Sequence, residues 1–306
     1  MKFLILGAGG VGGYFGGRLA ASGADVTFLV RERRQDHLKA NGLVIDSPLG
    51  NLTLAVNTTT AGNLRPDYQV VLLTCKAYDL DASMDAIAPA MAGGSAVLPL
   101  LNGIAHLDRL KQRFGAGSVL GGSCHIAATL TKDGVVKHLN DLHRIMFGEL
   151  DKSQSERILS IDAALRKSGV EAKLSPDILL EMWEKIAFLS TLAGMTCLMR
   201  GSVGRIASTP DGAALMQRYY AVCREVAARS GHTPRPQVVE RMGGVLADPN
   251  SPLTASMLRD LEAGGPVEAD HIVGYMLGKA REFGLDDTLL ATAYTHLKVY
   301  ESRNKA

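Results

Sequence analysis

The stretch of sequence that decides the fold lies at the N-terminus and reads KFLIL over Lys2–Leu6, followed by GAGGVG over Gly7–Gly12. The first five residues have the apolar composition of a buried strand, and the next six satisfy the pattern GxGxxG. A helical pattern then runs to Ser22-Gly23, and Asp25–Val30 has the composition of a second buried strand. Strand, glycine turn, helix and strand in this order predict a βαβ unit that binds the pyrophosphate of a dinucleotide.

The glycines of this turn have separate expected roles. One glycine permits a tight bend, one lets the backbone approach the pyrophosphate, and one lets the helix pack closely on the strand. The N-terminus of the helix adds free N–H groups and a favourable dipole for an anion. We therefore predict that the cofactor contacts Gly7, Gly9, Gly10, Val11 and Gly12, with a purely structural turn as the alternative.

The end of the second strand indicates which dinucleotide is bound. A site selective for NAD usually carries Asp or Glu there, to hold the ribose hydroxyls. This chain instead continues from Val30 into Arg31-Glu32-Arg33-Arg34. Because a guanidinium suits a 2′-phosphate better than a carboxylate does, we predict that Arg31 reads the 2′-phosphate of NADP(H). A solvated charged turn is the alternative interpretation.

The composition of the whole chain excludes several classes of protein. Its 306 residues are 46% hydrophobic and 21% charged, which excludes wholesale disorder, a collagen-like repeat and a coiled coil. Its 33 Lys and Arg residues against 31 Asp and Glu residues give a net charge of +2, so we expect neither nucleic acid nor a membrane as partner. The longest later apolar segment, 186–199, is shorter than the roughly 20 residues that span a membrane.

The cysteines and histidines show no metal-ligand spacing, so we expect no metal site. Four scattered cysteines without a CxxC pair are typical of the reducing cytoplasm, which is the expected location. Seven of the 33 glycines lie between Gly7 and Gly17, which argues against a signal peptide there. The oligomeric state stays open, with a homodimer as the candidate assembly.

Hydrophobic patterning divides the chain into an α/β part and a helical part. Short apolar runs alternate with helical patterns up to about residue 175, which is typical of a parallel, Rossmann-type sheet. Helical periodicity dominates afterwards. We therefore predict a dinucleotide-binding domain over 1–175 and an all-helical domain over 176–306. The strands expected beyond the first two are Leu43–Asp46 and Leu52–Val56 as a hairpin, Tyr68–Thr74, Ala96–Leu101, Val135–His138 and Arg144–Phe147 as antiparallel strands that close the sheet, and Val170–Leu174.

Two polar residues follow neighbouring strands of the predicted sheet. Lys76 follows the run that ends at Cys75, and Asn102 follows Ala96–Leu101. In an open α/β sheet the ligand binds beyond the carboxyl ends of the strands. Together these two residues are therefore candidate contacts for cofactor and substrate, although singly each could be a turn or surface residue.

The residues described so far, together with further motifs in the second half of the chain, make the sequence resemble the ketopantoate reductase (2-dehydropantoate 2-reductase) family over essentially its whole length. The resemblance is carried by Gly7–Gly12, Arg31, CKAYD with Lys76, LLNGI with Asn102, MWEKIAF with Lys185, and ASMLRDLEAGGPVEAD with Ser256 and Glu268. It implies a Rossmann domain followed by a helical domain, and reduction of a 2-keto acid by NADPH. It also implies Lys185 as catalytic acid with Glu268 as its partner. Asn102, Ser256 and Lys76 would contact substrate, and Lys76, Asn102 and Glu268 would also lie against the cofactor.

Elementary chemistry supports a role for Lys185. The residue lies in a helical segment with Trp183 and Ile186 beside it, where burial lowers the pKa of an ammonium and a nearby carboxylate raises it. Such an ammonium can protonate the alkoxide that forms when a carbonyl is reduced. Glu268 follows Gly264-Gly265 and Pro266, so we expect it in the first turn of a helix over 266–283, where any carboxylate is favoured.

One departure from the family pattern concerns the substrate. The family places asparagines four and eight residues after the catalytic lysine, whereas this chain has Leu189 and Ala193. Neither side chain can form hydrogen bonds to a polar substrate. Because the other residues of the family pattern are present, the expected reaction is still reduction of 2-dehydropantoate to pantoate in pantothenate biosynthesis. The missing asparagines make a paralogue acting on a less polar 2-keto acid the alternative. A non-catalytic NADP(H)-binding sensor is a further alternative.

Overall fold

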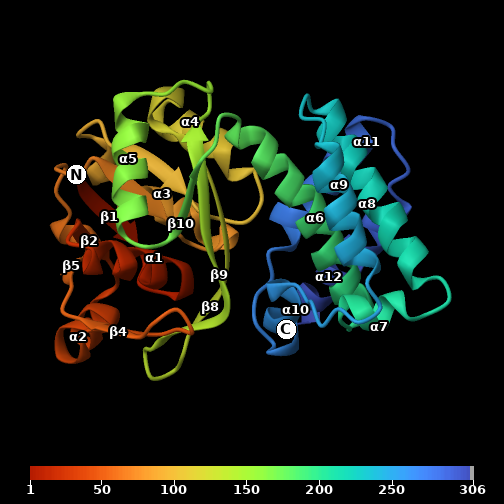
Figure 1. Ribbon diagram of the computed structural model, residues 1–306, viewed down its shortest axis with the longest axis horizontal. Helices are drawn as coiled ribbons and strands as arrows, with labels where there is room; N and C mark the ends of the chain where they lie inside the picture. The colour runs from red at the N-terminus through yellow and green to blue at the C-terminus, as the bar shows by residue number, and fades with distance from the viewer. Residues whose placement is uncertain (304–306) are drawn as a thin grey trace. The chain divides into compact units, whose positions relative to one another are not determined.

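The computed structural model describes residues 1–303 of the chain (Figure 1). Residues 304–306, at the end of the predicted 176–306 domain, lie outside this range. The described chain forms two compact units. The first comprises Met1–Leu101 and His106–Ile178, and the second comprises Asn102–Ala105 together with the residues from Leu179 onward.

The first unit is built on a parallel sheet of five strands in the order β5-β2-β1-β6-β7. The strands are β1 (Lys2–Leu6), β2 (Asp25–Leu29), β5 (Asn57–Thr59), β6 (Val70–Leu73) and β7 (Ala96–Pro99). Leu6 of β1 is in register with Leu29 of β2 and Leu73 of β6. The carboxyl ends of these strands therefore reach the same edge of the sheet, as the predicted Rossmann-type arrangement requires.

A second sheet in the same unit has the order β10-β9-β3-β4, with β8 paired to β9. Its strands are β3 (Leu43–Asp46), β4 (Leu52–Leu54), β8 (Leu120–Leu130), β9 (Val136–Glu149) and β10 (Glu171–Leu174). The predicted hairpin of β3 and β4 is confirmed. The two strands predicted over Val135–His138 and Arg144–Phe147 are not separate, because Val136–His138 and Arg144–Phe147 both belong to β9. This strand pairs antiparallel with β8.

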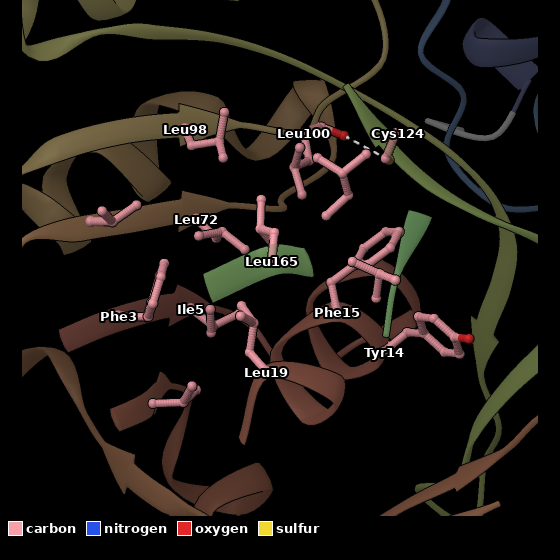
Figure 2. Packing of buried hydrophobic residues seen from close by; sticks show 14 of the residues in the cluster. Phe3, Ile5, Tyr14, Phe15, Leu19, Leu72, Leu98, Leu100, Cys124 and Leu165 are labelled. Carbon is pink, nitrogen blue, oxygen red and sulfur yellow. Dashed lines mark hydrogen bonds between the residues drawn. The ribbon is translucent and has the colours of Figure 1, made fainter. Parts of the chain in front are cut away.

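Helices α1 (Gly10–Ala21) and α5 (Glu156–Lys167) contribute side chains to the core of this unit. Figure 2 shows Phe15 and Leu19 of α1 and Leu165 of α5 gathered with apolar side chains of β1, β6 and β7. The remaining helical elements of the unit are α2 (Glu32–Asn41), α3 (Leu80–Met91), α4 (His106–Phe114) and three short 3-10 turns, η1 (Ala61–Asn63), η2 (Ala77–Asp79) and η3 (Ala116–Ser118).

Among its described residues, every regular element of the second unit is a helix or helical turn, as predicted. Its elements are α6 (Ile178–Met199), which begins at the last residue of the first unit, α7 (Val203–Ala207), α8 (Gly212–Arg229), α9 (Pro236–Ala247), α10 (Ser256–Glu262), the π-helical turn η4 (Asp270–Gly274), α11 (Tyr275–Glu282) and α12 (Thr288–Arg303). The single helix predicted over 266–283 is wrong in its first part, because residues 266–268 are not helical. Across residues 1–303, every helix is too short or too polar to cross a bilayer.

An ion pair in the first unit leads to a pH-dependent prediction. The buried carboxylate of Glu149, at the end of β9, accepts bonds from Arg157 Nε at 2.7 Å and from Ser155 Oγ at 2.5 Å. Burial acts to raise the pKa of Glu149, but these bonds outweigh it and hold the pKa below its ordinary value.

We therefore expect the pair to stabilise the fold above the unfolded carboxyl pKa of about 4.3, and this stability to be lost as the pH falls through the lower folded value. Urea unfolding of the wild type and Glu149→Gln between pH 7 and pH 3 tests this. Glu149→Gln should lose less stability on acidification, whereas the exposed control Glu156→Gln should follow the wild type. Parallel pH curves for the wild type and Glu149→Gln would contradict the prediction.

Candidate active site

The glycine turn begins directly at the end of β1. Gly7 has a φ of +88°, in the left-handed region that strongly favours glycine, and its N–H donates to the Leu29 carbonyl of β2 at 2.9 Å. A Cβ at Gly12 would overlap the Gly7 carbonyl oxygen and the Thr74 hydroxyl. Thr74 Oγ1 in turn donates to the Leu6 carbonyl at 2.7 Å. Gly7 thus makes the bend and Gly12 permits close packing of the helix, as the motif predicts.

Gly9 has the geometry expected for approach of a phosphate. An ideal Cβ at this residue meets nothing within 4 Å, so the protein leaves the backbone open here. Gly9 is the N-cap of α1, without a side-chain cap, and the first turn of α1 contains no acidic residue. An uncapped helix N-terminus without negative charge, next to open backbone, fits the pyrophosphate of a dinucleotide.

Arg31 and Lys76 lie at the same edge of the sheet as this turn. Arg31 is the exposed N-cap residue of α2, two residues after β2 ends. Lys76 is half-buried and lies between the end of β6 and the 3-10 turn η2. The first unit therefore brings together the glycine turn and the two cationic residues that the sequence assigned to the cofactor.

Arg34 also contacts the glycine turn, although no sequence pattern indicated it. Its Nη2 donates to the Ala8 carbonyl oxygen at 3.0 Å, and its Nη1 donates to the Gly134 carbonyl oxygen at 3.0 Å. Burial lowers the pKa of Arg34. The partners are 26 and 100 residues away in sequence, so only the folded chain reveals the contact.

In the second unit, Lys185 lies on α6 next to a cluster of buried charges. Arg235, the N-cap residue of α9, donates to Glu184 Oε1 from its backbone N at 2.8 Å and from Nε at 2.9 Å. Its Nη2 also lies 3.2 Å from Glu181 Oε2. Both carboxylates are buried, and the hydrogen bond with Glu184 raises the pKa of Arg235. The cluster fixes the turn of α6 that carries Lys185.

Aromatic rings pack around the same turn of α6. The Trp183 ring stacks on His232 with centroids 5.8 Å apart, and lies 6.1 Å from the ring of Tyr275. Tyr275 begins α11, immediately after the π-helical turn η4. The turn of α6 that carries Lys185 therefore packs close to the segment that follows Glu268.

Glu268 immediately precedes that segment rather than lying inside a helix. The predicted place in a first helical turn is wrong, because the irregular chain continues through Glu268 and the helical run starts at Ala269. Glu268 is buried, and its carbonyl accepts a bond from Ile272 N at 3.2 Å. An ideal Cβ at Gly103 lies 3.0 Å from the His271 carbonyl oxygen, so the Asn102-Gly103 turn packs against the segment after Glu268.

The remaining predicted residues lie on α10 and the later turns of α6. Ser256 is half-buried and is the first residue of α10. The preceding Ala255 N donates to Thr196 Oγ1 at 3.5 Å, about three turns beyond Lys185. This contact places the start of α10 beside the C-terminal half of α6. On α6 itself, Leu189 is half-buried and Ala193 is buried.

A metal site was not expected, and within residues 1–303 no three His, Cys, Asp or Glu side chains are grouped as metal ligands.

Comparison with known proteins gives a consistent result along the chain. The sequence profile of the family described as ketopantoate reductase PanE/ApbA matches residues 3–152, and the profile of its C-terminal part matches residues 177–301. An uncharacterised oxidoreductase of Bacillus subtilis, YkpB, is 36% identical over 302 residues, covering 99% of both chains. A 2-dehydropantoate 2-reductase of Nostoc is 26% identical and covers 99% of this chain and 96% of its own.

Solved structures share the fold. A 2-dehydropantoate 2-reductase from Geobacter metallireducens superimposes with a TM-score of 0.87 at 26% identity, covering 97% of this chain and 99% of its own. A ternary structure of D-mandelate dehydrogenase with NADH and anilino(oxo)acetate superimposes with a TM-score of 0.88 at 20% identity, covering 100% of both chains. At 20% identity, the likeness to D-mandelate dehydrogenase concerns the fold alone.

Proposed function

The chain belongs to the ketopantoate reductase family, and we propose that it reduces a 2-keto acid to the corresponding 2-hydroxy acid, with 2-dehydropantoate as the first candidate substrate. The family assignment makes the protein an oxidoreductase. The structural observation that most supports the proposal is the glycine turn, where the backbone at Gly9 is open beside the uncapped N-terminus of α1. With ketopantoate as substrate, the reaction would belong to cytoplasmic pantothenate biosynthesis.

NADP(H) is the cofactor of the family, and when bound it supplies the hydride. In this chain the turn from Gly7 to Gly12 would hold the pyrophosphate through backbone N–H groups. Arg31 would pair with the 2′-phosphate, since an exposed guanidinium at the end of β2 can donate two parallel hydrogen bonds to phosphate oxygens. Lys76 lies at the neighbouring strand end and would add positive charge beside the cofactor.

Residues of the helical unit would bind the keto acid and supply the proton. Lys185 would donate a hydrogen bond to the keto oxygen and protonate the developing alkoxide. Glu268, buried just before the π-helical turn, would orient that lysine. Asn102 lies on the turn that packs against the same segment, and Ser256 begins α10, and both would contact the substrate.

The substrate class depends on Leu189 and Ala193. A site that hydrogen-bonds a substrate hydroxyl rejects the analogue without it by a factor of about 10⁴–10⁵, whereas an apolar pocket discriminates by roughly 10–200-fold. Because neither residue can hydrogen-bond through its side chain, a less polar 2-keto acid stands as the second candidate. D-mandelate dehydrogenase, which shares the fold, has been solved with anilino(oxo)acetate, itself a 2-oxo compound.

A matched pair of substrates tests the proposal. Ketopantoate and 3,3-dimethyl-2-oxobutanoate differ only in one hydroxyl group, and NADPH oxidation measures kcat/KM for each. We expect turnover of both, with a preference below about 200-fold, since the family asparagines are absent. Leu189→Asn should shift the ratio towards ketopantoate, while the exposed control Met199→Asn on the same helix should not.

The ratio of the two kcat/KM values distinguishes the candidate functions. A preference for the compound without the hydroxyl group would identify a paralogue with an apolar substrate. A preference of 10⁴ or more for ketopantoate would contradict the argument from Leu189 and Ala193. Tight NADPH binding without turnover of either compound, or of a wider panel of 2-keto acids, would contradict the reductase and favour the cofactor-binding sensor.

A further inference from the structure

Arg34 connects the cofactor turn to a distant hairpin. One terminal nitrogen of its guanidinium donates to Ala8, between the first two glycines of the motif, and the other donates to Gly134. Gly134 lies in the turn that joins β8 to β9. Arg34 belongs to α2 and faces inward, unlike the exposed Arg31 and Arg33 before it on the same segment.

The bond to Ala8 determines the direction of the next N–H group. The Ala8 carbonyl and the Gly9 N–H belong to the same peptide unit, which is planar and trans, so they point in opposite directions. Because the Ala8 oxygen faces Arg34, the Gly9 N–H faces away from Arg34. Backbone N–H groups in a turn of this kind are the donors that bind pyrophosphate.

This peptide would otherwise rotate easily. Its rotation changes ψ of Ala8 and φ of Gly9, and glycine accepts positive and negative φ about equally well. Rotation would turn the Ala8 carbonyl oxygen towards a bound phosphate, with repulsion in place of a hydrogen bond. The bond from a protonated guanidinium opposes that rotation, and charged hydrogen bonds are stronger than neutral ones.

His37 and the hairpin turn hold Arg34 in place. Arg34 Nη1 lies 3.2 Å from His37 Nδ1, and His37 Nε2 lies 3.1 Å from the Asp133 carbonyl oxygen. With Nδ1 as acceptor and Nε2 as donor, both contacts are hydrogen bonds. The Gly134 N–H closes the hairpin turn on the Thr131 carbonyl at 3.0 Å. The guanidinium is thus fixed from the side opposite the glycine turn.

We propose that Arg34 is a positioning residue for the dinucleotide, which fixes the Ala8–Gly9 peptide so that the Gly9 N–H can bind the pyrophosphate. Its contribution should be the same for NADPH and NADH, because both carry the pyrophosphate and only one carries the 2′-phosphate. The inference rests on the dinucleotide site of the proposed function and is independent of the keto acid.

Cofactor titrations without keto acid test the proposal. Dissociation constants for NADPH and NADH are measured by nicotinamide fluorescence for the wild type, Arg34→Ala and Arg31→Ala. We expect Arg34→Ala to raise the dissociation constants of both cofactors by a similar factor of about 10–100. Arg31→Ala should raise the dissociation constant of NADPH alone. Lys39→Ala, at the exposed last turn of α2, removes an equal charge and should leave both constants within about twofold.

Hydrogen exchange of the protein without cofactor supplies a second readout. Arg34→Ala should speed exchange at least tenfold at the Gly13 amide, which donates to the Gly9 carbonyl at 2.8 Å, and in the Thr131–Gly134 turn, whereas His37→Ala should affect mainly the hairpin turn. If Arg34→Ala is too unstable, Arg34→Lys serves instead, because it keeps the charge but cannot span both carbonyls. It should lower the affinity for NADPH and for NADH by equal factors, which are smaller than those expected for Arg34→Ala.

Two outcomes would overturn the proposal. A selective loss of NADPH affinity in Arg34→Ala or Arg34→Lys would make Arg34 a direct phosphate contact. Unchanged constants for both cofactors would mean that the Ala8 bond has no part in binding. If neither cofactor binds the wild type, the proposed function fails as well, and that result is visible before any variant is compared.

Discussion

Replacing Lys185 with alanine is expected to lower kcat for 2-keto acid reduction by about 10²–10⁴-fold, with little change in NADPH affinity. The magnitude is that of a lost general acid, since the alkoxide would take its proton from water. Lys185 lies on α6, whereas the proposed pyrophosphate site lies in the other unit, on β1 and α1. A loss in kcat with an unchanged cofactor dissociation constant would therefore separate proton donation from cofactor binding.

A second lysine of the helical unit provides the control. Lys279 lies on α11 and pairs with Glu282 at 2.8 Å, and Lys279→Ala should leave kcat within about twofold. The measurement is steady-state NADPH oxidation at saturating keto acid, with cofactor affinity determined separately by fluorescence. If Lys185→Ala kept more than a third of wild-type kcat, another group would have to protonate the product.

Replacing Arg235 with methionine is expected to destabilise the helical unit by about 3–5 kcal/mol. Arg235 neutralises Glu181 and Glu184, and both carboxylates are buried. Without the guanidinium, two buried negative charges lie close together on α6, and the folded state either bears their repulsion or binds protons. The free energy of unfolding in urea measures the effect.

The chain offers a local probe and a matched control for this experiment. Its one tryptophan, Trp183, lies beside Glu184, so its fluorescence reports unfolding at the site of the substitution. Arg281 pairs with Asp287 at the surface, and Arg281→Met should cost at most about 1 kcal/mol.

Equal losses for Arg235→Met and Arg281→Met would contradict the prediction. Adding Glu181→Gln and Glu184→Gln to Arg235→Met should restore part of the stability, because the uncompensated charges are then removed.

The parts of the fold that follow from local sequence were predictable. The turn from Gly7 to Gly12 depends on backbone geometry that few residues other than glycine adopt, and the strand ends at Arg31 and Lys76 follow from short apolar runs. The pairing of β8 with β9 was not predictable in the same way, because a register shift between Ile126 and Ala128 interrupts the regular alternation on which strand prediction depends.

The tertiary contacts of the site lie beyond what sequence patterns reveal. Arg34 appears in the sequence as one more charge in a basic run, and Arg235 as an isolated arginine before a proline. Their partners are 26, 100 and 51 residues away. The start of the helix after Pro266 was expected too early, since proline favours a first helical turn but here the chain stays irregular through Glu268.

The short segment Asn102–Ala105 packs with the helical unit although it is embedded in the sequence of the other unit. During synthesis it therefore emerges long before the residues against which it packs. Gly103 packs against the backbone of His271, which lies about 170 residues later in the chain. At roughly 5–20 residues per second, the ribosome needs about 10–30 s to supply that partner. Until then the turn in the nascent dinucleotide unit has no partner, and a chain that stops before residue 271 would leave the turn without its packing surface.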